Sequence, residues 1–159
     1  MSSKKQVYLA GPFFSPEQTA RLDHVAELLA SNPSIDATAI FRPGEHAYPD
    51  AEFGTFEWQV ATFNIDTRQI DQADIVVAML DYQTEKGLSE PDSGTMWECG
   101  YAFANHKPVI LVRYQADLPI NLMLKGSATA IFNGEADLAN LATYDFYTLQ
   151  NKYVQTDVY

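Results

Sequence analysis

Cysteine is nearly absent from this chain of 159 residues, because Cys99 is the only one. A single cysteine cannot form an internal disulfide, which is typical of proteins from a reducing compartment. The sequence has no apolar run of about 18 residues, the length that a membrane-spanning helix needs. Its polar first residues, Met1 to Gln6, show no apolar signal core. These absences predict a cytoplasmic protein.

Basic residues are scarce: 10 Lys and Arg stand against 21 Asp and Glu, a formal net charge of −11. Such a surface repels nucleic-acid polymers and anionic membranes, so we expect neither as a partner. It also disfavours substrates that carry several phosphates. Hydrophobic residues make up 47% of the chain, enough for a sizeable core, and the length fits one domain spanning residues 1–159.

Several familiar motifs are missing. No G-x-G-x-x-G or G-x-x-x-x-G-K-[ST] sequence is present, which disfavours dinucleotide and P-loop sites. No G-x-S-x-G elbow marks a serine hydrolase. The three His and one Cys lie too far apart in sequence to suggest a zinc site.

Short apolar segments alternate with segments of helical period. We expect strands at residues 7–10, 37–41, 75–80, 108–112 and 129–132, and helices from Pro16 to about 32, at 55–70, 94–105 and 137–141. Ser15 and Gln18 form a predicted capping box, residues 42–54 a long loop, and residues 121–123 a short turn. This alternation predicts an α/β fold in a single domain. The expected architecture is doubly wound (flavodoxin- or Rossmann-like), with a mostly parallel five-stranded sheet flanked by helices. Ligands bind such sheets beyond the carboxyl ends of the strands.

Three carboxylates fall near these ends. Glu98 lies about one turn into its helix, where the helix dipole favours the ionised form that a nucleophile needs. Asp92 precedes the same helix. The alternative is that Glu98 supports the helix start and Asp92 caps it. Asp66 falls in the last turns of another helix, where the dipole raises its pKa and suits a general acid; alternatively it is simply solvated.

Aromatic residues near the strand ends allow two interpretations each. Tyr8 could point its hydroxyl into the cleft or pack in the core, and Phe13 and Phe14 could stack on a flat ligand or pack at the helix entry. Met123 is equally consistent with the core or with a ligand. His46 and His106 have no evident partners in the sequence, and Trp58 and Trp97 are interpreted as packing residues.

Five segments together resemble the nucleoside 2-deoxyribosyltransferases. They appear in the family's order and span nearly the whole chain: residues 7–14 (VYLAGPFF), 63–66 (FNID), 92–101 (DSGTMWECGY), 119–123 (PINLM) and 157–159 (DVY). Each segment alone is weakly specific, but the ordered set is fairly specific.

The resemblance implies an enzyme that moves 2′-deoxyribose between purine or pyrimidine bases. Glu98 would attack the anomeric carbon and form a covalent deoxyribosyl-enzyme, and attack by the second base would give net retention. Asp66 would protonate the leaving base, Asp92 would orient the sugar or base, and Tyr8 would hold Glu98 by a hydrogen bond. No metal or organic cofactor is needed for this chemistry.

The family also implies a homo-oligomer, a hexamer built as a trimer of dimers, with active sites shared between subunits. Asn121 and Met123 would meet the 5′ end of the sugar in a neighbouring subunit's site, and the carboxylate of Tyr159 could complete the pocket. A glutamine that some relatives use to read the base is not clearly present, and Glu45 or His46 could replace it.

Two other functions stay open. Related hydrolases cleave deoxynucleoside 5′-monophosphates, but they carry phosphate donors, often Ser, where this chain has residues 121–123. A non-enzymatic nucleotide-sensing domain of the same fold is the second.

Overall fold

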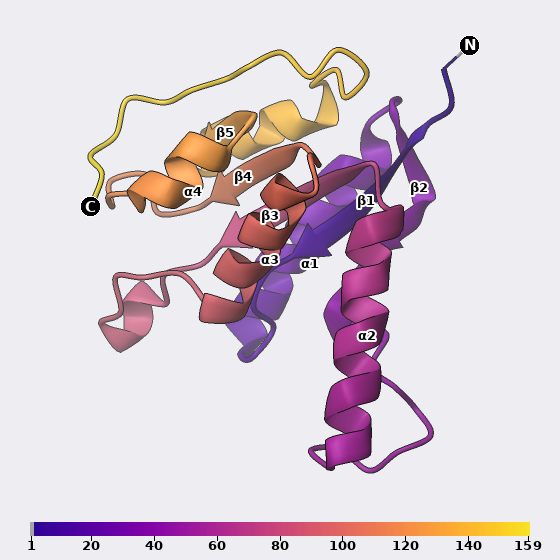
Figure 1. Cartoon of the computed structure of the whole chain (residues 1–159). Helices are drawn as coiled ribbons and strands as arrows, with labels where there is room; N and C mark the ends of the chain where they lie inside the picture. Colours follow the sequence, from indigo (N-terminus) through magenta and orange to yellow (C-terminus); the bar gives the residue numbers. More distant parts are fainter. Residues whose placement is uncertain (1) are drawn as a thin grey trace.

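The computed structural model describes residues 2–159 and contains one five-stranded sheet (Figure 1). The strands lie in the order β2-β1-β3-β4-β5, and all four neighbouring pairs are parallel. Their bounds are β1 Lys5–Ala10, β2 Ile35–Phe41, β3 Ile75–Leu80, β4 Val109–Arg113 and β5 Ala130–Asn133. The predicted doubly wound α/β fold is confirmed.

Helices cover both faces of this sheet. The α-helices are α1 Pro16–Ser31, α2 Phe56–Gln72, α3 Ser93–Ala104, α4 Leu122–Ser127 and α5 Glu135–Leu138, with short 3₁₀ helices at Pro43–Glu45, Thr84–Lys86 and Ala139–Ala142. One buried cluster joins α1 and the segment after β5 to one face, and a second joins α2, α3 and α4 to the other. The start of α2 and the loop before it project away from the body (Figure 1).

Alternation along the strands explains these two cores. Val77 and Met79 of β3 face the α1 side, whereas Val76 and Ala78 face the α3 side, and the whole strand is buried. A continuously apolar strand is therefore what a central position in a parallel sheet requires. On β1 the same alternation turns Tyr8 toward the α3 side.

The element boundaries differ from the predicted ones in two instructive places. The expected turn at residues 121–123 is wrong: these residues open helix α4, and the Asn121 side chain caps it by accepting from the Met123 N–H at 2.9 Å. The prediction of a capping box at the start of α1 is only half correct. Ser15 Oγ does accept from the Gln18 N–H, but Gln18 Oε1 accepts from Phe14 N at 2.9 Å, one residue earlier than expected.

A buried asparagine joins α1 to the segment after β5. Asn32 ends α1, and its Nδ2 donates to the carbonyls of Leu141 and Tyr144 at 2.6 and 2.8 Å. Its Oδ1 accepts from the Ser34 N–H at 2.9 Å. Buried polar groups are stable only when they are paired, and Asn32 pairs three backbone groups at once.

Strands β1 and β3 are neighbours in the sheet, but their following helices, α1 and α3, pack on opposite faces. The chain therefore diverges beyond the carboxyl ends of these two strands. Such a switch point opens a crevice where ligands bind in doubly wound folds. No helix within residues 2–159 is long and apolar enough to cross a membrane.

Candidate active site

A hydrogen bond joins Tyr8 on β1 to Glu98 on α3. The Tyr8 hydroxyl donates to Glu98 Oε1 at 2.6 Å, and the Tyr8 side chain is fully buried. Its ring stacks on Phe41 with centroids 5.5 Å apart, which fixes its direction. Burial and the Glu98 charge raise the pKa of Tyr8 above its ordinary value, so the hydroxyl keeps its proton and serves as a donor.

Burial dominates the ionisation of Glu98. The pKa of this carboxyl is raised to about 7, chiefly by burial; the Tyr8 hydrogen bond lowers it, and the charges of Asp66 and Asp92 contribute to the rise. The prediction that the helix dipole favours ionised Glu98 is wrong in its outcome. Glu98 lies more than one turn beyond Ser93, and the dipole acts mainly within the first turn. Desolvation therefore outweighs it.

As predicted, Asp66 lies in the last two turns of α2, which ends at Gln72. Burial raises the pKa of Asp66 to about 6, and the nearby His46 opposes this shift. The predicted direction is confirmed, but its cause is desolvation. Asp66 Oδ1 is buried and has no hydrogen-bond partner within residues 2–159, so a ligand could supply one.

Glu98 and Asp66 line the same cavity, about 270 Å³ in volume, between α2 and α3. Its other lining residues are Phe63, Thr67, Ile70, Gly94 and Trp97. Trp97 stacks on Tyr101 with centroids 5.2 Å apart, and Phe63 meets it at a tilt. Trp97 was interpreted as a packing residue, but it is half exposed and gives this cavity an aromatic wall.

Asp92 caps helix α3, as its alternative interpretation supposed. Its Oδ2 accepts from the backbone N–H of Thr95 at 2.9 Å and from the Thr95 hydroxyl at 3.1 Å. Asp92 also lines a second cavity, about 190 Å³ in volume, together with Phe14 and Asp81. Asp92 is also near enough to Glu98 for its charge to raise the pKa of that carboxyl.

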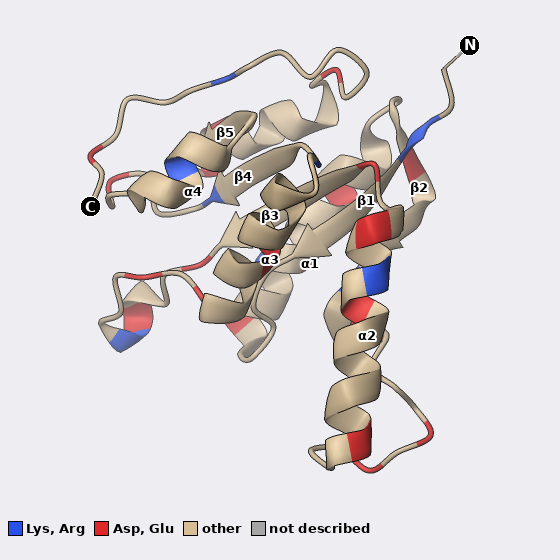
Figure 2. Cartoon of the chain, in the orientation of Figure 1, with Lys and Arg blue, Asp and Glu red and all other residues tan. Residues whose placement is uncertain are grey.

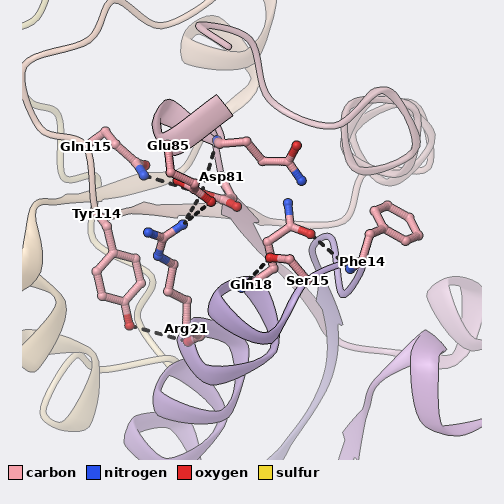
Figure 3. A network of polar contacts seen from close by, with 9 residues as sticks. Phe14, Ser15, Gln18, Arg21, Asp81, Glu85, Tyr114 and Gln115 are labelled. Carbon is pink, nitrogen blue, oxygen red and sulfur yellow. Dashed lines mark hydrogen bonds and ion pairs between the residues drawn. The ribbon is translucent and has the colours of Figure 1, made fainter. Parts of the chain in front are cut away.

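A polar network ties the loop after β3 to helix α1 (Figure 3). Asp81, directly after β3, accepts from Arg21 at 2.7 Å and from Gln115 at 3.3 Å through the same oxygen, Oδ1. The sequence interpretation did not single out Asp81. A charged residue immediately after a wholly apolar strand was the signal that could have identified it.

The loop after β2 contains two of the predicted base-reading residues. Glu45 forms an ion pair with Arg42 at 3.0 Å, and it lines a cavity of about 250 Å³ with Phe13, whose ring packs against Gly44. His46 instead stacks on Phe41 with centroids 4.6 Å apart. Because Phe41 also stacks on Tyr8, these three rings form one stacked series. His46 is close enough to Asp66 to act on its pKa, whereas Glu45 lines the separate cavity with Phe13.

Asn121 and Met123 do not line the cavity of Glu98. They line a separate apolar groove of about 490 Å³ between α3 and α4, together with Met96, Gly100 and Phe103. Tyr159 pairs with the same turn: its N–H donates to the carbonyl of Ile120, and its own carbonyl accepts from Leu122. Within one chain, therefore, these three residues are positioned together but away from Glu98.

The arrangement suits carboxylate chemistry. Two buried carboxyls with raised pKa values share one aromatic-walled cavity, so one can hold a proton while the other is ionised. Residues 2–159 contain no group of three or more His, Cys, Asp or Glu that could hold a metal ion. Acidic positions are spread along the chain, and apart from the adjacent Lys4 and Lys5 the few Lys and Arg positions are separated from one another along it (Figure 2).

Comparisons with known proteins identify the family of this chain. A family model described as nucleoside 2-deoxyribosyltransferase matches residues 7–137. A nucleoside deoxyribosyltransferase of Limosilactobacillus fermentum is 32% identical, over 78% of this chain and 76% of that protein. The structure of a 2-deoxyribosyltransferase from Bacillus psychrosaccharolyticus is similar with a TM-score of 0.78 and 34% identity, covering 94% of this chain and 99% of that one. A conserved protein of Enterococcus faecalis shares the fold, at 20% identity and a TM-score of 0.67 over 88% of this chain and 98% of that one. The chain therefore belongs to the nucleoside 2-deoxyribosyltransferase family and is a pentosyltransferase.

Proposed function

We propose that this enzyme transfers 2-deoxyribose between purine or pyrimidine bases through a covalent deoxyribosyl intermediate on Glu98. The observation behind this proposal is the shared cavity in which Tyr8 fixes Glu98 while Asp66 keeps an unpartnered oxygen. We treat residues 1–159 as one such transferase domain, and we place it in the cytoplasm.

The first half-reaction breaks the bond from the anomeric carbon to the base and forms an ester bond from that carbon to a Glu98 oxygen. The electron pair of the broken bond stays on the base nitrogen, which takes the proton of Asp66. The incoming base then attacks the anomeric carbon from the vacated face and returns its proton to Asp66. The ester bond breaks at the same time, and its electron pair returns to Glu98 as a carboxylate. Two inversions at one carbon give net retention.

Negative charge in the cavity supports departure of the base. Positive charge develops on the sugar as the base leaves, and the carboxylates of Glu98 and Asp92 stabilise it, joined by Asp66 once it has given its proton to the base. Tyr8 keeps one Glu98 oxygen engaged, which orients the other toward the anomeric carbon. The aromatic wall of Phe63 and Trp97 offers the base a stacking surface.

Oligomerisation would complete the site. Large apolar side chains are exposed at Phe53 in the loop before α2, at Phe56 on the projecting start of α2, and beside the α3–α4 groove. We propose a homo-oligomer, a hexamer as a trimer of dimers, in which Asn121, Met123 and Tyr159 reach the site of a neighbouring subunit.

Incubation with deoxyinosine and adenine tests the activity directly. Transfer predicts formation of deoxyadenosine; release of free deoxyribose without exchange would instead support the hydrolase alternative. Glu98→Ala should lose several orders of magnitude in exchange rate, while Glu27→Ala at an exposed position of α1 should behave as wild type. Near-normal exchange by Glu98→Ala would refute the nucleophile assignment, and a fluorinated slow substrate should leave a covalent adduct on Glu98 in intact-protein mass spectra.

A further inference from the structure

The Asp81 carboxylate is almost completely buried but only half satisfied. Its side chain is 1% exposed, and all its hydrogen bonds, from Arg21, Gln115 and the Gln83 N–H, go to Oδ1. The second oxygen, Oδ2, has no partner within residues 2–159. An unpaired buried oxygen of a carboxylate is unfavourable, so its persistence calls for a ligand that pairs it.

Gln18 presents the complementary group beside it. This residue is 1% exposed, and its carbonyl oxygen is used by the Phe14 N–H. Figure 3 shows the amide nitrogen of Gln18 turned toward the Asp81 side of the network with no interaction drawn to it. One wall thus offers a free acceptor, Asp81 Oδ2, and a free donor, Gln18 Nε2.

Both residues line the 190 Å³ cavity that also contains Asp92. This cavity lies at the switch point, because its walls come from the segments after β1, where Pro12 and Phe14 lie, and after β3. The position is the one where doubly wound sheets bind their ligands. Its Asp92 is two residues before Gly94, which lines the Glu98 cavity, and its helical wall comes from Gln18 of α1 rather than from α2.

We propose that Asp81 and Gln18 form a subsite for a hydroxyl group of the substrate's deoxyribose. This inference rests on the proposed function, which places the anomeric carbon at Glu98 and the base at Asp66 on the α2 side. The sugar then extends away from the base, past Asp92, toward this cavity. A hydroxyl donates one hydrogen bond and accepts others, which matches the acceptor of Asp81 and the donor of Gln18.

The charge of the subsite excludes an anionic group in that place. Asp81, Glu90 and Asp92 all line the cavity, and it has no Lys or Arg in its lining. A phosphate on the hydroxyl would meet these carboxylates at short range, where like charges repel strongly. The subsite therefore selects free nucleosides over nucleotides phosphorylated at that hydroxyl.

Asp81→Asn tests the subsite with little change of shape. Asparagine keeps an oxygen for Arg21 but places an N–H₂ donor where Oδ2 was, so it cannot accept from a hydroxyl. We compare kcat/KM for deoxyinosine, 2′,3′-dideoxyinosine and 2′,5′-dideoxyinosine, each with adenine as acceptor. The variant should lose about 10- to 100-fold with deoxyinosine, the effect of a hydrogen bond to a charged acceptor. It should lose nothing with the one analogue that lacks the recognised hydroxyl, which identifies that hydroxyl as 3′ or 5′.

Two further variants keep the test decisive. Gln18→Met removes the donor and should show the same selective loss. It therefore tests the subsite even if Asp81→Asn fails to fold. Arg21→Gln breaks the ion pair but leaves Oδ2 in place, and should affect all three substrates by one common factor. Equal losses across the substrates, or none, in Asp81→Asn and Gln18→Met would overturn the subsite while leaving the transferase assignment intact. Absence of base exchange in the wild-type enzyme would overturn both.

Discussion

Replacing Tyr8 by Phe isolates the contribution of one hydrogen bond to the nucleophile. The bond of 2.6 Å from the Tyr8 hydroxyl stabilises ionised Glu98 and so lowers its pKa against the effect of burial. A hydrogen bond to a charged group contributes about 1.5–3 kcal/mol, which corresponds to roughly 1–2 pKa units. The pKa of Glu98, about 7 in the wild type, should therefore rise to about 8–9 in Tyr8→Phe.

The kinetic consequence depends on pH. At pH 7 about half of the wild-type Glu98 is ionised, whereas in the variant the ionised fraction falls to roughly 1–10%. The variant should thus be about 5- to 50-fold slower at pH 7 in kcat/KM, and the deficit should shrink to about twofold or less at pH 9, where Glu98 is largely ionised in both. The ratio of the kcat/KM values of the two enzymes does not depend on the ionisation of Asp66, because both enzymes contain this residue.

The assay is base exchange from deoxyadenosine to cytosine, whose bases do not titrate between pH 7 and 9. Tyr101→Phe is the matched control: this tyrosine lies on α3 and donates to Asp71 at 2.9 Å, away from Glu98, so its removal should leave the pH profile unchanged. A Tyr8→Phe deficit of equal size at pH 7 and pH 9 would refute the reasoning, since it would show that Tyr8 acts by packing and not through the ionisation of Glu98.

Three other predictions concern ionisation, proton transfer and buried polarity. Glu98→Gln should be more stable than the wild type at pH 8 by up to about 3 kcal/mol in urea unfolding. The pKa of folded Glu98 is raised from 4.5 to about 7, so the free energy of unfolding of the wild type falls as pH rises between these values. A stability difference between variant and wild type that is no larger at pH 8 than at pH 4.5 would contradict this. Asp66→Asn should lose about 10²- to 10⁴-fold with deoxyinosine, yet far less with 7-methyl-2′-deoxyguanosine, whose base leaves without taking a proton; equal losses in stopped assays would exclude Asp66 as the acid. Asn32→Ala should lower the free energy of unfolding by about 2–4 kcal/mol, because it leaves the carbonyls of Leu141 and Tyr144 buried and unpaired; a change below about 1 kcal/mol would show that the site relaxes.

The fold could be predicted because its determinants are local or periodic. The continuous apolar run of β3 fixed a central strand, and Ser15 before Pro16 marked the start of α1. The direction of the Asp66 shift was also predicted, although from the wrong cause. Helix position is visible in a sequence, whereas the burial that raises the pKa of Asp66 is a property of the assembled fold.

Interactions between distant segments were beyond such reasoning. The ionisation of Glu98 was mispredicted because the desolvating neighbours come from β1 and α2, not from its own helix. Likewise, no pattern connects Gln18 with Asp81, since only the adjacency of β1 and β3 in the sheet brings the segments that follow them together. Helix α4 was missed, and a turn predicted in its place, for a simpler reason: the helix is too short to show a period.

The half-exposed position of Trp97 gives the enzyme a built-in optical reporter. The chain has two tryptophans, and the other, Trp58, packs against Phe53 near the projecting start of α2. Trp97 instead lines the cavity of Glu98 and Asp66. A base that stacks there should quench its emission, so a Trp58→Phe enzyme would reveal each arrival and departure of a base in real time, without a label and without turnover.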